Sequence, residues 1–128
     1  MKLKNRDIVS FINGCVALKE KKLPIKIGYA INRNIIALTE AAEAYNMARE
    51  KIIKEYAEKD SKGELVIRDD CYVFKDKQAF NKDLEELLDI DTEVNLHTIS
   101  ENDIEKCDDS RYDALTLADL DTLCIMIK

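Results

Sequence analysis

Hydrophobic residues recur every three or four positions near the start of the chain, which is the spacing of an amphipathic helix. The pattern predicts a first helix over residues 5–21, with Asn5 as its N-cap. Gly14 lies in the middle of this helix and either weakens it or allows another helix to approach closely. The apolar stripe of the helix consists of Ile8, Phe11, Ile12, Cys15 and Leu18.

A second and much longer helix is predicted over residues 24–59, because Pro24 suits the first turn of a helix. Along this helix one apolar stripe has heptad spacing, as in a coiled coil. A stripe of this length cannot be covered by one short helix, so we expect it to form the interface of a homo-oligomer. The alternative is an ordinary core stripe in a helix that is kinked near Gly28. The stripe consists of Ile31, Leu38, Tyr45 and Ile52.

The second half of the chain alternates short strands with short helices. Residues 64–68 and 71–75 are rich in strand-forming side chains and flank Asp69-Asp70, which predicts a β-hairpin. Asp76 is expected to cap a helix that ends at residue 88. Residues 92–99 alternate between apolar and polar side chains and predict a third strand that pairs with the hairpin.

The last quarter of the chain is predicted to be helical. Ser100 and Asp103 have the spacing of a capping box, which predicts a short helix after them. A final helix is predicted over residues 116–127, and the side chains expected on its buried face are Leu117, Leu120, Leu123, Cys124 and Ile127.

Together these elements predict an α+β, mainly helical protein that forms one domain over residues 1–128. A helical stalk occupies residues 1–60. The hairpin, the third strand in a small antiparallel sheet and the shorter helices occupy residues 61–128. The chain has only three glycines and one proline, and this scarcity of turn residues argues against an all-β fold.

Cysteine and hydropathy patterns favour a cytoplasmic protein with reduced thiols. The four cysteines form no Cys-x-x-Cys pair, and the single histidine, His97, has no cysteine close to it in sequence. We therefore expect no metal site and no cofactor. No apolar run approaches the roughly 20 residues of a membrane span, and no signal-peptide core is recognisable.

Charge is unevenly distributed. Residues 1–33 contain eight basic and two acidic residues and have a net charge of +6. The whole chain has a net charge of −6, so the other 95 residues carry a net charge of −12. The start of the long helix is a natural anion site, because free N–H groups and the helix dipole point there. The candidate ligand-binding residues are Lys22, Lys26, Tyr29, Asn32, Arg33 and Asn34. The alternative is a turn with solvated lysines and with Tyr29 in the core.

Catalytic motifs are absent from the sequence, and we expect a protein that is not an enzyme. The chain has no Gly-x-Ser-x-Gly, no phosphate-binding glycine loop and no His-Glu-x-x-His. Cys71 and His97 fall on predicted strands that pair in this arrangement, so a Cys–His pair is the remaining catalytic alternative. The acidic C-terminal part either solubilises the protein or offers a surface to a basic partner. General nucleic-acid binding is disfavoured by the net charge.

The order of motifs resembles small uncharacterised proteins encoded by bacteriophages and prophages of Gram-positive bacteria. The resemblance covers residues 22–100, and it rests on Leu23-Pro24, on Tyr45, Arg49, Ile52 and Tyr56, on residues 59–63 and 72–76, and on Phe80-Asn81 with residues 85–88. It implies a phage origin and the cytoplasm of a host bacterium as the location. It transfers no functional residues.

These observations together lead to a functional hypothesis. We expect a non-enzymatic binding protein that counteracts a host process. In an anti-defence role of this kind, it either sequesters a nucleotide signal at the basic helix entrance or blocks a defence protein. The alternative function is a structural or assembly accessory of the virion.

Overall fold

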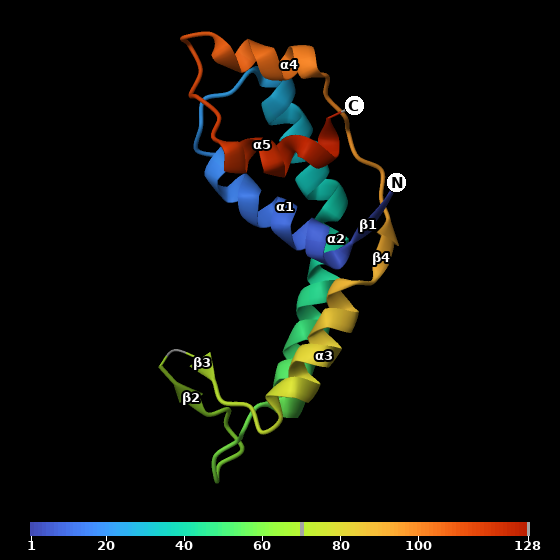
Figure 1. The fold of residues 1–128 in the computed structure, drawn as a ribbon, viewed down its shortest axis with the longest axis vertical. Helices are drawn as coiled ribbons and strands as arrows, with labels where there is room; N and C mark the ends of the chain where they lie inside the picture. Colours follow the sequence, from blue (N-terminus) through green and yellow to red (C-terminus); the bar gives the residue numbers. More distant parts are fainter. Residues whose placement is uncertain (70, 128) are drawn as a thin grey trace.

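One long helix, α2 (Ile25–Tyr56), organises the molecule (Figure 1). The computed structural model describes residues 1–69 and 71–127. The mainly helical α+β fold predicted from the sequence is confirmed. The other elements are β1 (Lys2–Lys4), α1 (Asn5–Leu18), β2 (Ile67–Arg68), β3 (Cys71–Tyr72), α3 (Lys77–Leu88), β4 (Asp91–Glu93), α4 (Glu101–Glu105), the 3-10 turn η1 (Lys106–Asp108), α5 (Leu117–Leu123) and the 3-10 turn η2 (Cys124–Met126).

Helix α2 is continuous over 32 residues, which corresponds to about 48 Å. Pro24 is its N-cap, and the helix passes through Gly28 without a break. The alternative of an ordinary core stripe is borne out by the burial of Ile31 and Leu38, whereas the break at Gly28 that accompanied it is not observed. It ends at Tyr56 because Ala57 is extended and bridges to Phe74 on the far side of the hairpin.

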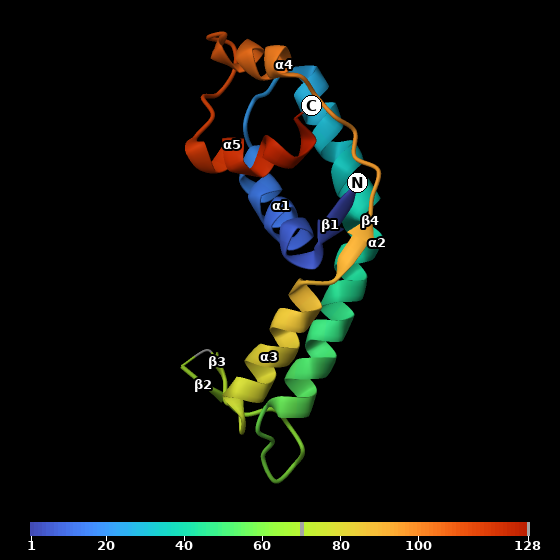
Figure 2. The same cartoon turned by 45° about the vertical axis from the view of Figure 1, so that its right-hand side comes forward.

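The heptad stripe of α2 is buried within one chain. Ile31, Leu38 and Tyr45 are 2%, 0% and 7% exposed, and Ile52 packs against a smaller cluster near the end of the helix. Helix α1 covers the first half of α2 and α3 covers the second half (Figure 2). Two short helices placed end to end therefore cover most of the stripe that was expected to bind a second copy. Ile31, Leu38 and Tyr45 offer no free surface for that purpose, whereas Ile52 is partly buried.

The junction between the two covering helices is held by polar contacts. Arg6, in the first turn of α1, places Nη2 2.6 Å from Oδ1 of Asp89 and 2.9 Å from Oε2 of Glu85. These hydrogen bonds raise the pKa of Arg6, and the bond from Arg6 lowers the pKa of Asp89. Asn5 was predicted to cap α1, but it is the first helical residue, and its Nδ2 donates to the carbonyl of Leu87 at 2.8 Å.

The strands form two separate two-stranded antiparallel sheets. The hairpin β2–β3 pairs Ile67 with Tyr72, as predicted. The prediction that the third strand joins the hairpin is wrong, because β4 pairs with β1 and places Leu3 opposite Thr92. Helix α3 runs back along α2 from the hairpin, so β4 begins beside the N-terminal residues rather than beside β2 and β3 (Figure 1).

The hydrophobic core has two parts. The larger part lies between α1, α5 and the first half of α2, and its most buried side chains are Ile8, Cys15, Leu18, Ile27, Leu38, Leu123 and Met126. The smaller part lies at the other end of α2 and contains Ile53, Ala57 and Phe80. There Phe74 stacks on Phe80 with 4.0 Å between ring centroids.

Side-chain caps define the starts of the shorter helices. Asp76 caps α3 by accepting from the N–H of Ala79 at 3.1 Å, as predicted. Ser100 and Asp103 form the predicted capping box of α4. Thr116 and Asp119 form a further box at α5, which the sequence analysis did not identify.

Helix α5 buries a different face from the predicted one. Leu123 is fully buried as expected, but Leu117 is 82% exposed and Leu120 is 37% exposed. The reason is that the inward face includes Asp119, whose Oδ2 receives a hydrogen bond from Lys21 Nζ at 2.6 Å. The chain then tightens into η2, which buries Met126 in place of Cys124.

We predict that the free energy of unfolding falls as the pH drops below about 4, the ordinary pKa of an aspartate. Burial alone would raise the pKa of Asp119, but hydrogen bonds from Lys21 and Thr116 outweigh it and hold this pKa below its usual value. The stabilisation is therefore complete above the pKa of the unfolded chain and is lost as the pH falls through that of the folded chain. Urea unfolding at a series of pH values measures the effect. Asp119→Asn should flatten the profile, and an unchanged profile would contradict the assignment.

We predict opposite effects for alanine at two helical glycines. A Cβ at Gly14 would clash with the Thr122 side chain, including its Cβ at 2.9 Å, whereas a Cβ at Gly28 meets no atom within 4 Å. Gly14→Ala should lower the free energy of unfolding by about 1–3 kcal/mol through overpacking. Gly28→Ala should raise it by about 0.5–1 kcal/mol, because alanine favours helix. Urea denaturation measures both. Equal effects would show that α1 and α5 do not pack closely at Gly14.

Candidate functional site: the groove between α2 and β4

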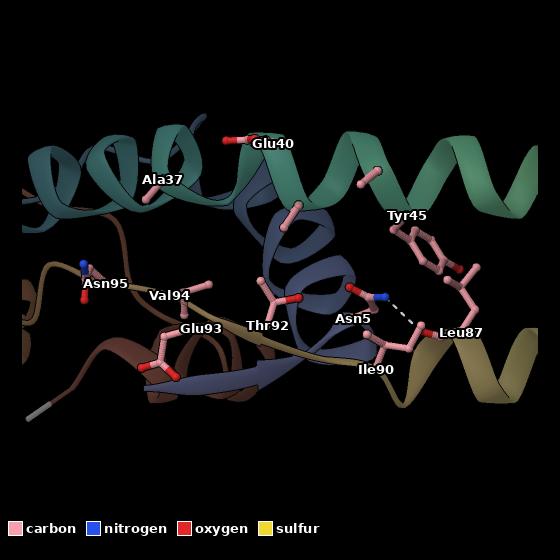
Figure 3. A pocket seen from close by; sticks show the side chains of 12 residues that line it. Asn5, Ala37, Glu40, Tyr45, Leu87, Ile90, Thr92, Glu93, Val94 and Asn95 are labelled. Atoms are coloured by element: carbon pink, nitrogen blue, oxygen red, sulfur yellow. Dashed lines mark hydrogen bonds between the residues drawn. The ribbon is translucent and has the colours of Figure 1, made fainter.

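A groove of about 680 Å³ runs between the middle of α2 and the extended segment that includes β4 (Figure 3). It lies where the end of α3 meets the start of α1, at the junction of the two helices that cover α2. Helix α2 contributes Ala37, Glu40, Ala41, Ala44 and Tyr45. The other lining residues are Asn5, Leu87, Ile90, Thr92, Glu93, Val94 and Asn95.

The groove exists because α2 carries small side chains along this face. Ala37, Ala41 and Ala44 are spaced four and three residues apart, so they lie on one side of the helix. Their methyl groups do not reach the facing strand, and the space between the two segments stays open. At one end Tyr45, which is 7% exposed, closes the floor. The floor is therefore apolar and shallow.

The rims of the groove are polar and carry negative charge. Glu40 stands on the α2 side and Glu93 on the strand side (Figure 3). The N-terminal amine of Met1 lies 2.8 Å from Oε1 of Glu93. At the closed end, the hydrogen bond from Asn5 to the Leu87 carbonyl fixes the wall. Among the described residues, the lining includes no lysine or arginine, and its charged side chains are Glu40 and Glu93, of which Glu93 pairs with the Met1 amine.

The predicted anion site is only partly assembled. Arg33 Nη1 donates to the Tyr29 hydroxyl at 3.0 Å, and the Tyr29 ring contacts the His97 ring edge-on at 5.6 Å. These three side chains form one exposed cluster. Lys26 lies near them along the helix, but its Nζ is 3.8 Å from the Asp103 carboxylate, which already offsets part of its charge.

The other predicted ligand residues have different roles. Asn34 is fully buried, and it binds the backbone of His97 from both sides: Nδ2 donates to the carbonyl at 3.0 Å, and Oδ1 accepts from the N–H at 2.7 Å. Asn32 faces a small cavity near the end of α1. The backbone N–H of Lys22 donates to Asp113 at 2.7 Å. The six residues therefore do not converge on one site.

The structure separates Cys71 from His97. Cys71 lines a cavity with Arg49 and Ile53 near the end of α2, whereas His97 contacts Tyr29 near its start. The 20 residues of helix between positions 29 and 49 correspond to about 30 Å. The Cys–His catalytic alternative is therefore wrong.

In residues 1–69 and 71–127, no group of three or more histidine, cysteine, aspartate or glutamate side chains could hold a metal ion. Over the same part of the chain, no helix combines the length and the apolar character that a membrane span requires.

Burial raises the pKa of the Cys15 thiol to about 11, and it also raises the pKa of the Cys107 thiol, so both thiols pack as neutral groups.

Sequence reasoning missed the groove, although one signal for it exists. Three alanines at helical spacing on one side of a long helix indicate a face that can accept another segment at close range. The opposite wall could not be predicted, since it depends on the pairing of β4 with β1 across about 90 residues of chain.

We predict that Asn34→Leu lowers the free energy of unfolding by about 2–4 kcal/mol, because it leaves the His97 N–H and carbonyl without their partner. Urea denaturation measures the loss. Asn46→Leu, on an exposed position of the same helix, serves as the control and should change stability by less than about 0.5 kcal/mol. Similar values for the two variants would mean that Asn34 does not fix the segment after β4.

Comparison of the chain with family models, with curated proteins and with solved structures found no match in any of the three. No relative therefore supplies an activity or a ligand.

Proposed function

We propose that this protein acts by binding a short, cationic and partly apolar segment of a partner protein in the groove between α2 and β4. The groove itself carries the proposal. Its alanine floor accepts apolar side chains, and Glu40 on the α2 rim can attract lysine or arginine. Glu93 on the other rim already pairs with the Met1 amine, which offsets part of its charge.

The overall charge supports a cationic partner. The chain has a net charge of −6, and the strongly acidic part follows the basic N-terminal segment. A negative field attracts a basic segment before contact and raises the association rate. Apolar contact with the groove floor then supplies the part of the affinity that salt does not screen.

Blocking of a host protein agrees better with this geometry than capture of a nucleotide. A nucleotide at the start of α2 would meet the Asp103 carboxylate beside Lys26, and it would find Asn34 already bound to the backbone of His97. Tyr29 and Arg33 alone are a small basis for phosphate recognition. We retain the phage-encoded, anti-defence hypothesis in its protein-blocking form.

The test uses a fluorescent peptide of about eight residues that alternates leucine and lysine. We predict saturable binding by fluorescence anisotropy, with weaker binding at high salt because exposed charges are screened. Ala44→Trp should weaken binding by at least about tenfold, since the indole fills the groove. Ala17→Trp, at an exposed position of α1, is the matched control and should bind like the wild type.

Two further probes separate the alternatives. A matched peptide with glutamate in place of lysine should not bind, because the rims repel it. A fluorescent ATP analogue tests the nucleotide hypothesis, and Arg33→Ala reports on its site. Equal binding of both peptides, or binding of the nucleotide alone that is lost in Arg33→Ala, would overturn the groove proposal.

A further inference from the structure

Helix α2 carries a row of exposed apolar side chains on the side away from its buried stripe. Ile25, Tyr29, Ile36 and Met47 are 88%, 53%, 75% and 73% exposed. At about 100° per residue, all four lie within about 40° of one another around the helix, about half a turn from the buried stripe that includes Leu38. We call these four residues the outer stripe. Single exposed apolar residues are ordinary, but an aligned row along one helix indicates an interface.

We propose that the outer stripe packs against the same stripe of a second copy, as an antiparallel homodimer. Ile25, Ile36 and Met47 are spaced 11 residues apart. If the twofold axis passes through Ile36, then Ile36 meets Ile36 of the partner subunit and Ile25 meets Met47 of the partner subunit. The pairing is symmetric and closed, as a twofold interface requires.

Charges beside the outer stripe favour the same register. In α2 up to residue 36 the charged residues are Lys26 and Arg33, whereas those of the next 14 residues are Glu40, Glu43, Arg49 and Glu50. Arg49 lies on the opposite side of the helix, near the buried stripe. The antiparallel register places Arg33 close to Glu40 of the partner subunit on one flank. A parallel pairing would instead place like charges opposite each other, which is unfavourable.

Glu43 lies within the outer stripe, between Ile36 and Met47, so an interface must supply it with a partner. The antiparallel register places it opposite Tyr29 of the partner subunit. Within one chain the Tyr29 hydroxyl already accepts from Arg33 at 3.0 Å, which leaves its proton free to donate to a carboxylate. Each buried carboxylate thereby obtains a hydrogen-bond donor with a positive charge next to it.

The outer stripe is long and is separate from the groove. It extends over about 33 Å of helix, more than half of α2. The groove alanines lie about 100° around α2 from the stripe. The proposed dimer therefore leaves the alanine floor open but engages Glu40, which also lines the groove. The groove is accordingly tested at Ala44 and the dimer at Ile36, neither of which belongs to both surfaces.

Sedimentation equilibrium tests the dimer with the full chain. A single chain has a mass of 14.7 kDa, so the wild type should sediment at twice that mass. Ile36→Glu should raise the dimer Kd at least about 100-fold, because two carboxylates would meet at the twofold axis. Val16→Glu replaces an exposed apolar residue of α1, 66% exposed, and should leave the dimer intact. A monomeric wild type at about 100 μM, or a dimer that survives Ile36→Glu, would overturn the proposal.

Disulfide cross-linking tests the register in a Cys71→Ser, Cys124→Ser background, which removes the exposed native thiols. Ile36→Cys should cross-link to itself. Ile25→Cys and Met47→Cys chains should cross-link only when mixed. Self-linking of Ile25→Cys alone would show a parallel arrangement and overturn the register.

A charge exchange gives a third readout. Arg33→Glu and Glu40→Arg should each weaken the dimer by about tenfold, and the double variant should recover most of the loss, since the pair is restored with its signs reversed. Additive losses in the double variant would exclude the Arg33–Glu40 pair across the axis.

Discussion

The length of α2 is the constraint on which the rest of the structure depends. A helix of about 48 Å presents a longer apolar stripe than any other helix of this chain can cover. The chain meets this constraint by placing α1 and α3 end to end along it, and their junction is fixed by Arg6 with Asp89 and Glu85. The groove lies at this junction, where neither covering helix reaches the alanine face. The arrangement of α1 and α3 that covers α2 therefore also creates the groove.

Much of the local structure could be predicted because its signals are local. The stripe of α1, the proline at the start of α2 and the Asp76 cap of α3 each act within one or two turns. The strand partner of β4 could not be predicted in the same way, since β1 has only three residues and lies about 90 positions away. The heptad stripe was identified correctly as apolar, but spacing alone does not distinguish a partner in the same chain from one in another copy.

The candidate ligand residues illustrate a further limit of sequence reasoning. Lys22 precedes α2, and the other five side chains are distributed around the circumference of the helix, because each residue turns by about 100°. Asn34 consequently faces the core, Asn32 faces the end of α1, and only Tyr29 and Arg33 remain together at the surface. By contrast, residues three, four or eleven positions apart share a face, and it is these spacings that produce the alanine floor and the outer stripe.

The small cluster at the hairpin end has an implication for sequence variation. The hairpin is supported by Phe74 on Phe80 and by Ile53 and Ala57, whereas the groove depends on the other core around Leu38. The two clusters have no residue in common, so a change in the length or charge of the hairpin bears directly on the local cluster and not on the core around the groove.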